Sequence, residues 1–445
     1  MASAIRISPP AKRVFAIALP AIGEAYLQNL LGVADTFFIA KLGLISLDAV
    51  GITNVYNMTY IGVFMAVSAT ISVFLSRAVG AKNKSQGRAA IWHGFLIAFA
   101  LGIILSFASV YFAVPLLHIM GATGVLQRTA LPYFSIVLGI SPLIALFTTQ
   151  SAAFRAIGDT KTPLRVALEM NAIHVAFDYF LIFGVGSFHG FGLKGAALAM
   201  VLARLYALLR LWMKSRTVDD LALLRTDLKL SLAISWRMIK FAVPAALERL
   251  SMRVGQVIYF GLIVRMGIDV YATHNIAGTL TTFAYTIGSG FAIAATTTIG
   301  QAIGSGNVDD AKIYRRWSYI ESAVAMTVIT IILWLFSPWL GLLFSHNQHV
   351  IHLLFIILAI DIASQPFLAA VLVDTSAIQA GGNSKFPMIT TIIGIWGIRT
   401  LGVYVFAWHF HFGLPAVWIS IGSDNALRAG LFLWYRRTHN WIRKL

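Results

Sequence analysis

Two aspartates lie within strongly apolar stretches of this chain, where a charged side chain is costly. Asp35 lies within Gly32–Ile39, a segment that supplies no basic partner. Asp178 follows Asn171 and His174 at the spacing i, i+3 and i+7, which places all three on one helix face. A charge at the centre of a membrane helix costs about 2.5–3.5 kcal/mol, and such residues usually line a cavity or a proton path. Because two carboxyl groups in a poorly hydrated cavity resist ionising together, the pattern predicts a proton-coupling site of Asp35 and Asp178, supported by Asn171 and His174.

The competing interpretation gives these residues a structural role. Each aspartate could cap or hydrogen-bond a helix without carrying a proton, and His174 could be a packed polar residue.

Two glutamates each follow a proline by four residues, Glu24 after Pro20 and Glu248 after Pro244. Proline inside a helix frees a carbonyl group and permits a bend, and a bend beside a carboxylate suits a moving gate. We therefore add Pro20 and Glu24 to the first site as supporting residues, although a purely structural kink is the default interpretation of both prolines.

The second half of the chain carries a weaker candidate site made of Glu248, Tyr259 and Asp374. Tyr259 stands where the first half has Asp35, and Gly402 where it has Asp178, so the two halves differ in charge. Proton chemistry is accordingly predicted in the first half. Ion pairing is predicted among the other charges of the second half, which are Arg253, Glu321, Asp361, Asp374, Arg399, Asp424 and Arg428.

No known catalytic spacing accompanies these charges. The chain lacks a GxxxxGK[ST] phosphate loop, an HExxH pair and a GxSxG elbow, and it contains no cysteine. We therefore predict that the protein is not an enzyme and has no metal site and no cofactor.

Composition indicates the elements that must hold these residues. Of 445 residues 58% are hydrophobic and 11% charged, with a mean hydropathy of +0.80. A soluble protein carries roughly 25% charged residues, and apolar runs near 20 residues cross the bilayer as helices. We predict an all-α membrane protein with twelve transmembrane helices, at 14–39, 47–75, 91–117, 127–152, 164–187, 192–212, 238–263, 270–299, 317–344, 350–374, 388–411 and 413–435.

The chain also repeats itself. Nine residues recur at one constant offset: Pro20, Glu24, Gly43, Ile52, Gly80, Asn83, Gly158, Lys161 and Pro163 match Pro244, Glu248, Gly267, Ile276, Gly304, Asn307, Gly382, Lys385 and Pro387. An even number of crossings in each half makes the repeats parallel, a construction typical of secondary transporters. The predicted organisation is an N-lobe at 1–212, a linker at 213–237 and a C-lobe at 238–445.

Basic residues predict the orientation in the membrane. The net charge of +17 is spread over short loops between apolar runs, so we do not attribute it to binding of nucleic acid. An excess of Lys and Arg marks cytoplasmic loops, which places both termini and the linker inside a bacterial inner membrane. The residues on that side include Arg6, Lys12, Arg13, Arg77, Lys82, Lys84, Arg88, Arg155, Lys161, Lys214, Arg216, Arg225, Lys229, Lys312, Arg315, Arg316, Lys385, Arg436, Arg437, Arg443 and Lys444.

Taken in order along the chain, these features resemble the multidrug and toxic compound extrusion (MATE) family, and within it the DinF-like branch. The motifs that carry the resemblance are Asp35–Gly43, Ala49–Gly51, Asp178–Gly184, Gly195–Ala199 and the repeated Gly-x-x-Lys-x-Pro loops. The resemblance implies two six-helix lobes in a V shape, cation-coupled export of amphipathic and usually cationic compounds, Asp35 and Asp178 as coupling carboxylates, and a first helix that bends near Pro20.

The chain departs from that pattern at two places. His174 stands where the family often has asparagine, and Gly195–Leu202 lacks the expected hydroxyl residue. Both departures favour protons over sodium, so we predict a monomeric proton-coupled exporter of amphipathic drugs or dyes. The alternatives are a sodium-coupled MATE exporter, a lipid-linked saccharide flippase, which should show a strongly cationic cavity, and a membrane-embedded enzyme.

Overall fold

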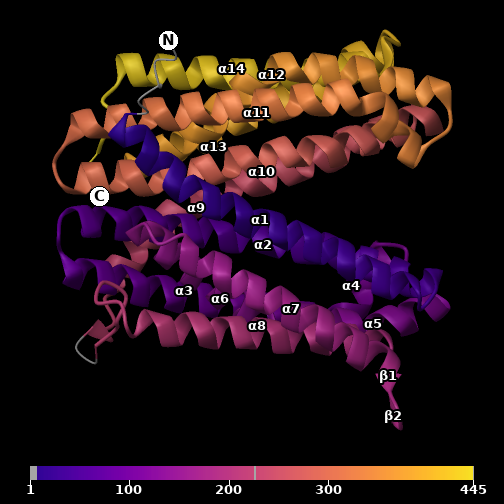
Figure 1. Ribbon diagram of the computed structural model, residues 1–445, viewed down its shortest axis with the longest axis horizontal. Helices are drawn as coiled ribbons and strands as arrows, with labels where there is room; N and C mark the ends of the chain where they lie inside the picture. Colours follow the sequence, from indigo (N-terminus) through magenta and orange to yellow (C-terminus); the bar gives the residue numbers. More distant parts are fainter. Residues whose placement is uncertain (1–7, 225–226, 444–445) are drawn as a thin grey trace, which may run out of the picture. The chain divides into compact units, whose positions relative to one another are not determined.

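The computed structural model describes residues 8–224 and 227–443, so Arg6, Arg225 and Lys444 lie outside the described residues. The chain is almost entirely helical, apart from a short antiparallel hairpin of β1 (Gly184–Val185) and β2 (Phe188–His189) (Figure 1). The helices of the first half are α1 (Pro9–Ala40), α2 (Leu44–Gly80), α3 (Lys84–Tyr111), α4 (Ala113–Ile119), α5 (Gly124–Gly139), α6 (Ser141–Ile157), α7 (Lys161–Phe183) and α8 (Leu193–Ser215). Those of the second half are α9 (Leu232–Val264), α10 (Ile268–Gly304), α11 (Val308–Phe344), α12 (Gln348–Ala380), α13 (Lys385–Ile392), the π-helices η2 (Ile393–Thr400) and η3 (Val403–His409), and α14 (Gly413–Thr438).

Length and apolar composition make these helices membrane spans. Among the described residues, nine helical segments are long and apolar enough to cross a bilayer, and the pair α5–α6, bent by 41°, makes a tenth. The remaining two are α9 and α14, whose hydropathy is lowered by charged residues such as Glu248 and Asp424. The predicted all-α fold with twelve spans is confirmed, and every predicted span falls on one of these segments.

Several of the repeated residues begin or end helices. Gly43 and Gly267 precede α2 and α10 with φ values of 102° and 124°, a backbone region that side chains rarely tolerate. Asn83 and Asn307 cap α3 and α11, and each side chain accepts a hydrogen bond from the backbone N–H three residues on, at 3.0 and 3.1 Å. The duplicated sequence pattern therefore repeats the same helix boundaries in the two halves.

The described chain forms two compact units. Each unit contains the start of the first helix of one repeat and the remainder of the first helix of the other repeat. One unit is Gly23–Ala246. The other combines Met1–Ile22, described from Ser8 onward, with Leu247–Leu445, described to Arg443. The two division points are equivalent positions of the two repeats, because each lies shortly after the proline inside α1 or α9. The predicted lobes 1–212 and 238–445 differ from these units in the first helix of each half.

Side-chain contacts account for this division. A Cβ on Gly290 of α10 would overlap the side chain of Ile22, so the start of α1 packs tightly against α10. The rings of Phe74 on α2 and Phe241 on α9 meet edge to face at 5.9 Å, which joins the start of α9 to the first repeat. The chain therefore divides within α1 and within α9, although each of them is a single unbroken helix.

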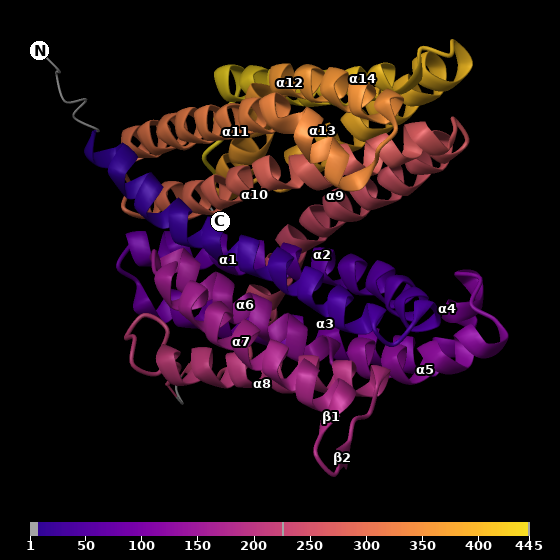
Figure 2. The same cartoon turned by 45° about the vertical axis from the view of Figure 1, so that its right-hand side comes forward.

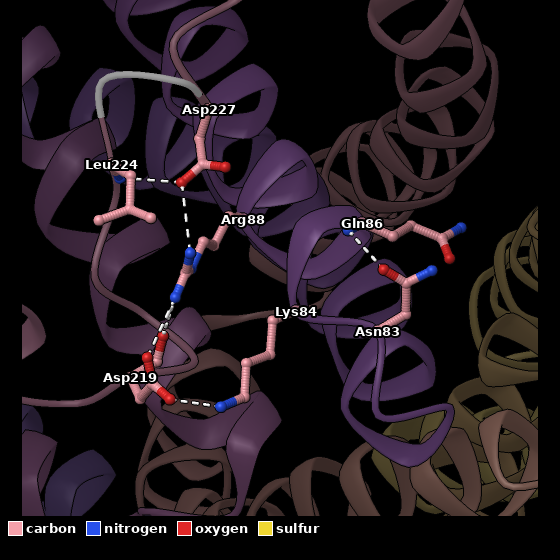
Figure 3. A network of polar contacts seen from close by, with 7 residues as sticks. All are labelled: Asn83, Lys84, Gln86, Arg88, Asp219, Leu224 and Asp227. Carbon is pink, nitrogen blue, oxygen red and sulfur yellow. Dashed lines mark hydrogen bonds and ion pairs between the residues drawn. The ribbon is translucent and has the colours of Figure 1, made fainter.

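The segment between α8 and α9 is fastened to the start of α3 by charged contacts (Figure 3). Asp219 pairs with Lys84 and with Arg88, whose Nη2 lies 3.1 Å from Oδ1 of Asp219. Arg88 also lies 3.7 Å from Asp227, and Asp227 accepts a hydrogen bond from the backbone N–H of Leu224 at 2.8 Å. The linker is therefore docked on the first repeat by its own acidic residues.

Replacing Asp219 by asparagine should loosen this linker. The amides of residues 216–224 are expected to exchange with solvent faster in D219N, as measured by hydrogen–deuterium exchange. D220N is the matched control, because the neighbouring Asp220 makes no ion pair within 4.0 Å among the described residues. Lys84 holds the pKa of the Asp219 carboxyl below its ordinary value of about 3.9, so acid should release the wild-type linker only below about pH 4. Equal exchange in D219N and D220N would contradict the assignment.

Candidate functional site

Asp35 on α1 and His174 and Asp178 on α7 meet at one place in the Gly23–Ala246 unit. Nε2 of His174 lies 3.9 Å from Oδ1 of Asp35 and 3.6 Å from Oδ1 of Asp178. One ligand atom from each of the three residues lies within 4.8 Å of the others. Because His174 and Asp178 are four residues apart, consecutive turns of α7 present both on one face. The structure thus brings together three residues that the sequence analysis assigned to one site.

These carboxyl groups are buried without the hydrogen bonds that buried charges usually receive. Asp178 is 1% exposed, while the side chain of Asp35 keeps 20% of its surface accessible. In the part of the chain that the structure describes, Oδ1 of Asp35 and both carboxyl oxygens of Asp178 have no hydrogen-bond partner. Leaving a buried charged group unsatisfied is expensive, so the arrangement is typical of groups that bind a proton, a cation or a ligand.

Asn171 lies one turn before His174 and links α7 to α1. Its Nδ2 donates to the backbone carbonyl of Leu27 at 2.7 Å, while its Oδ1 is buried and has no hydrogen-bond partner among the described residues. An amide fixed in this way presents its oxygen as a free acceptor near the contact between α1 and α7. Asn171 therefore adds a neutral oxygen to this side of the bundle.

Glu24, which the sequence analysis placed in support of this site, is engaged elsewhere. Nη1 of Arg155 on α6 lies 2.9 and 3.0 Å from its two carboxyl oxygens, and the Glu24 side chain is 5% exposed. A carboxylate neutralised by arginine inside the bundle joins α1 to α6, four residues after Pro20. We therefore assign Glu24 to the contact between the two helices and not to the acidic cluster.

In the second repeat the equivalent glutamate is bound by an amide and a hydroxyl group instead of an arginine. Glu248 and Gln379 occupy the positions of Glu24 and Arg155, and Nε2 of Gln379 lies 3.2 Å from Oε2 of Glu248. The hydroxyl of Thr391 lies 3.4 Å from the other oxygen of Glu248. The first repeat therefore pairs this buried glutamate with an arginine, whereas the second surrounds it with neutral donors.

The candidate second-half site of Glu248, Tyr259 and Asp374 is not assembled as one cluster. The ring of Tyr259 packs edge to face with Phe260 at 5.2 Å and lies in an apolar core. Asp374 instead pairs with Arg315 at 2.6 Å and with Arg436 at 3.3 Å. Asp374 is therefore neutralised by two arginines and is not paired with Glu248 in a common site.

A second group of buried charges lies where the π-helix η2 meets α14. Asp424 is fully buried, and its carboxyl oxygens lie 2.7 Å from Arg399 and 2.8 Å from Arg428. A Cβ on Gly394 would overlap Oδ1 of Asp424, so only glycine allows η2 to approach this closely. Ion pairing in the second half is thus found for Asp374, Arg399, Asp424 and Arg428. Asp361 instead accepts hydrogen bonds from Ser364 and Gln365, and Arg253 donates to Gln256.

The sequence analysis missed two residues that belong beside the acidic cluster. Arg204 on α8 follows Met200 by one turn, and Met200 packs in one core with Ile39 of α1 and Ile182 of α7. Tyr133 on α5 is 3% exposed and packs in the core that includes Ile39 and Ile182, each one turn beyond Asp35 or Asp178. The repeat contained the signal for Arg204, because Arg428 stands at the equivalent position of the second half.

Comparison with known proteins identifies the family. The MatE family model matches twice, at residues 20–180 and 244–405, and its two matches begin at the repeated prolines Pro20 and Pro244. A probable multidrug resistance protein NorM of Thermotoga maritima is 27% identical over 97% of this chain and 93% of its own length. An uncharacterized transporter, YisQ of Bacillus subtilis, is 29% identical over 97% of this chain and 95% of its own length.

Solved structures agree with this assignment at the level of the fold. A MOP superfamily transporter from Pyrococcus furiosus superposes with a TM-score of 0.89 at 22% identity, over 98% of each chain. The two matches of the family model cover well over half of the sequence and coincide with its two repeats. The chain therefore belongs to the MatE family of multi-pass membrane transporters and is not an enzyme.

Proposed function

We propose that this protein is a proton-coupled antiporter that exports amphipathic organic cations by alternating access. The observation that supports this most directly is the cluster of Asp35, His174 and Asp178, which places two carboxyl groups in the bundle with no basic side chain other than His174 within 4.0 Å among the described residues. The names of relatives described as multidrug resistance proteins support export of drug-like compounds.

The proposed cycle uses one site for two ligands in turn. Ionised Asp35 and Asp178 attract an organic cation, whose charge offsets theirs in a poorly solvated environment. Protonation from the outer side removes that attraction and releases the cation outward, and loss of the protons to the cytoplasm restores it. His174 lies between the two carboxyl groups and can share a proton with either. Pro20 lies inside α1 and has no backbone N–H to donate to the preceding turn, so a bend of α1 at this proline would let that helix respond to the change.

Sodium coupling is the second candidate, because α1 and α7 offer several buried oxygens. Asp35, Asp178 and Asn171 all have carboxyl or amide oxygens that are buried and without a hydrogen-bond partner in residues 8–224 and 227–443. Hard cations prefer oxygen ligands, whereas a histidine nitrogen suits them poorly. The presence of His174 between the carboxyl groups is our reason for favouring protons.

Transport into vesicles under one gradient at a time should separate these candidates. In proteoliposomes loaded with a cationic fluorescent dye, an imposed proton gradient with equal sodium on both sides is expected to drive dye movement. A sodium gradient at clamped pH should not. Dye movement driven by sodium alone would overturn proton coupling and establish the second candidate.

The membrane topology is part of the same proposal. We place both termini and the docked linker in the cytoplasm of a bacterial cell, with the chain acting as a monomer, because the basic residues concentrate at that end of the helices. Assignment to the DinF-like branch also remains a prediction.

A further inference from the structure

An arginine lies among the helices that form the acidic cluster, and the proposed cycle does not use it. Arg204 is partly exposed and makes no ion pair within 4.0 Å with any carboxylate of the described residues. Arginine is always charged, and an unneutralised charge within a membrane bundle is by default a sign of function. An anion that neutralises this guanidinium would therefore have to come from outside the described side chains.

Packing places Arg204 at the same level of the unit as the carboxyl groups. Met200 and Ala197, one and two turns before Arg204 on α8, pack in one core with Ile39 of α1 and Ile182 of α7. Asp35 and Asp178 precede Ile39 and Ile182 by four residues, so each lies one turn from the same core.

The approach of α7 to α8 is close enough for side chains on both helices to share one ligand. A Cβ on Gly195 would overlap the backbone carbonyl of Leu181, so these two helices pack with almost no side chain between them at that point. Figures 1 and 2 show α7 and α8 as neighbours that come together at the end where β1 and β2 join them.

The second repeat shows what a purely structural arginine looks like at this position. Arg428, the counterpart of Arg204, is 3% exposed and pairs with Asp424 one turn earlier on the same helix. In the first repeat the position of Asp424 is taken by Met200. Arg204 therefore lacks the built-in partner of its counterpart.

This inference rests on the proposed function of the same site and specifies its substrate class. We propose that Arg204 binds the anionic group of an amphipathic zwitterionic substrate, while Asp35 and Asp178 hold its cationic group. A guanidinium matches a carboxylate with two parallel hydrogen bonds, which gives the contact direction as well as charge. With the carboxyl groups ionised, the site then offers both signs of charge to one molecule.

Two dyes that differ in one charge can test the inference. Rhodamine 110 carries a free carboxylate beside its cationic ring system and is a zwitterion, whereas rhodamine 123 is its methyl ester and a simple cation. Binding of each to the purified full-length protein in detergent is measured by fluorescence polarisation, without any gradient. The variants are R204Q, R204K and the control R210Q, which removes an arginine of the same helix that pairs with Glu169 at 3.0 Å.

The expected result is a loss that is specific to the carboxylate. R204Q should weaken binding of rhodamine 110 by about 10- to 100-fold, the usual effect of removing a charged hydrogen-bond partner, and leave rhodamine 123 unchanged. R204K should recover part of that loss, and R210Q should bind both dyes like the wild type.

Other outcomes would overturn the inference. If R204Q weakens both dyes equally, Arg204 is structural, and if it weakens neither, Arg204 does not contact the substrate. Wild-type protein that binds rhodamine 123 but not rhodamine 110 would also refute a zwitterion site while leaving export of cations intact. Because no gradient is used, these results are independent of whether protons or sodium drive transport.

Discussion

Replacing Asp35 by asparagine is expected to abolish proton-driven efflux of a cationic dye from cells or proteoliposomes. The asparagine amide keeps the size of the side chain but neither binds a proton nor carries negative charge. Position 35 can then bind neither the coupling proton nor the cationic dye. Asp35 is also the more accessible member of the cluster, with 20% of its side chain exposed against 2% for the side chain of Asp178. Transport should fall to the level of empty vesicles, and D178N should show the same defect.

D48N provides the matched control for this experiment. Asp48 is an exposed aspartate near the start of α2, and its replacement removes an acidic group from the membrane region without touching the cluster. We expect D48N to transport like the wild type. Wild-type efflux by D35N would remove Asp35 from the mechanism, and with it the proposed coupling site.

Most of the fold was predictable because helix boundaries are encoded locally. Gly43 and Gly267 stand at positive φ, and Asn83 and Asn307 supply caps, so the same residue types had to recur at the same places. The wide turns of η2 and η3 were not predictable, because nothing in an apolar run distinguishes a π-helix from an α-helix. The close approach of η2 to Asp424 on α14, which Gly394 permits, was equally hidden, because these residues are far apart in sequence.

The acidic cluster was predictable in part for a similar reason. The spacing of His174 and Asp178 fixes a common helix face, and the cost of burying charge in lipid points to Asp35. The pairing of Glu24 with Arg155 was not predictable, because the two residues lie 131 positions apart in sequence and local patterns cannot pair such residues. Arg204 was missed although the repeat could have revealed it, since comparison with Arg428 and Asp424 shows an arginine that lacks its aspartate.

The largest loss of stability is expected from Asp424→Asn. Its carboxylate lies between Arg399 and Arg428 at 2.7 and 2.8 Å and has no exposed surface, so the variant leaves two buried guanidinium groups without a countercharge. Removing one partner of a buried ion pair costs about 3–5 kcal/mol. The free energy of unfolding, measured by equilibrium denaturation in mixed detergent micelles, should fall by that amount.

A matched substitution separates burial from charge pairing as the cause of that loss. D309N breaks a pair with Lys312 at 2.9 Å in which the aspartate side chain is 85% exposed, and such surface pairs contribute about 0–1 kcal/mol. If D424N and D309N destabilise the protein equally, Asp424 does not neutralise the two arginines. If D424N alone is strongly destabilised, the second repeat uses its arginine to hold α14 against η2.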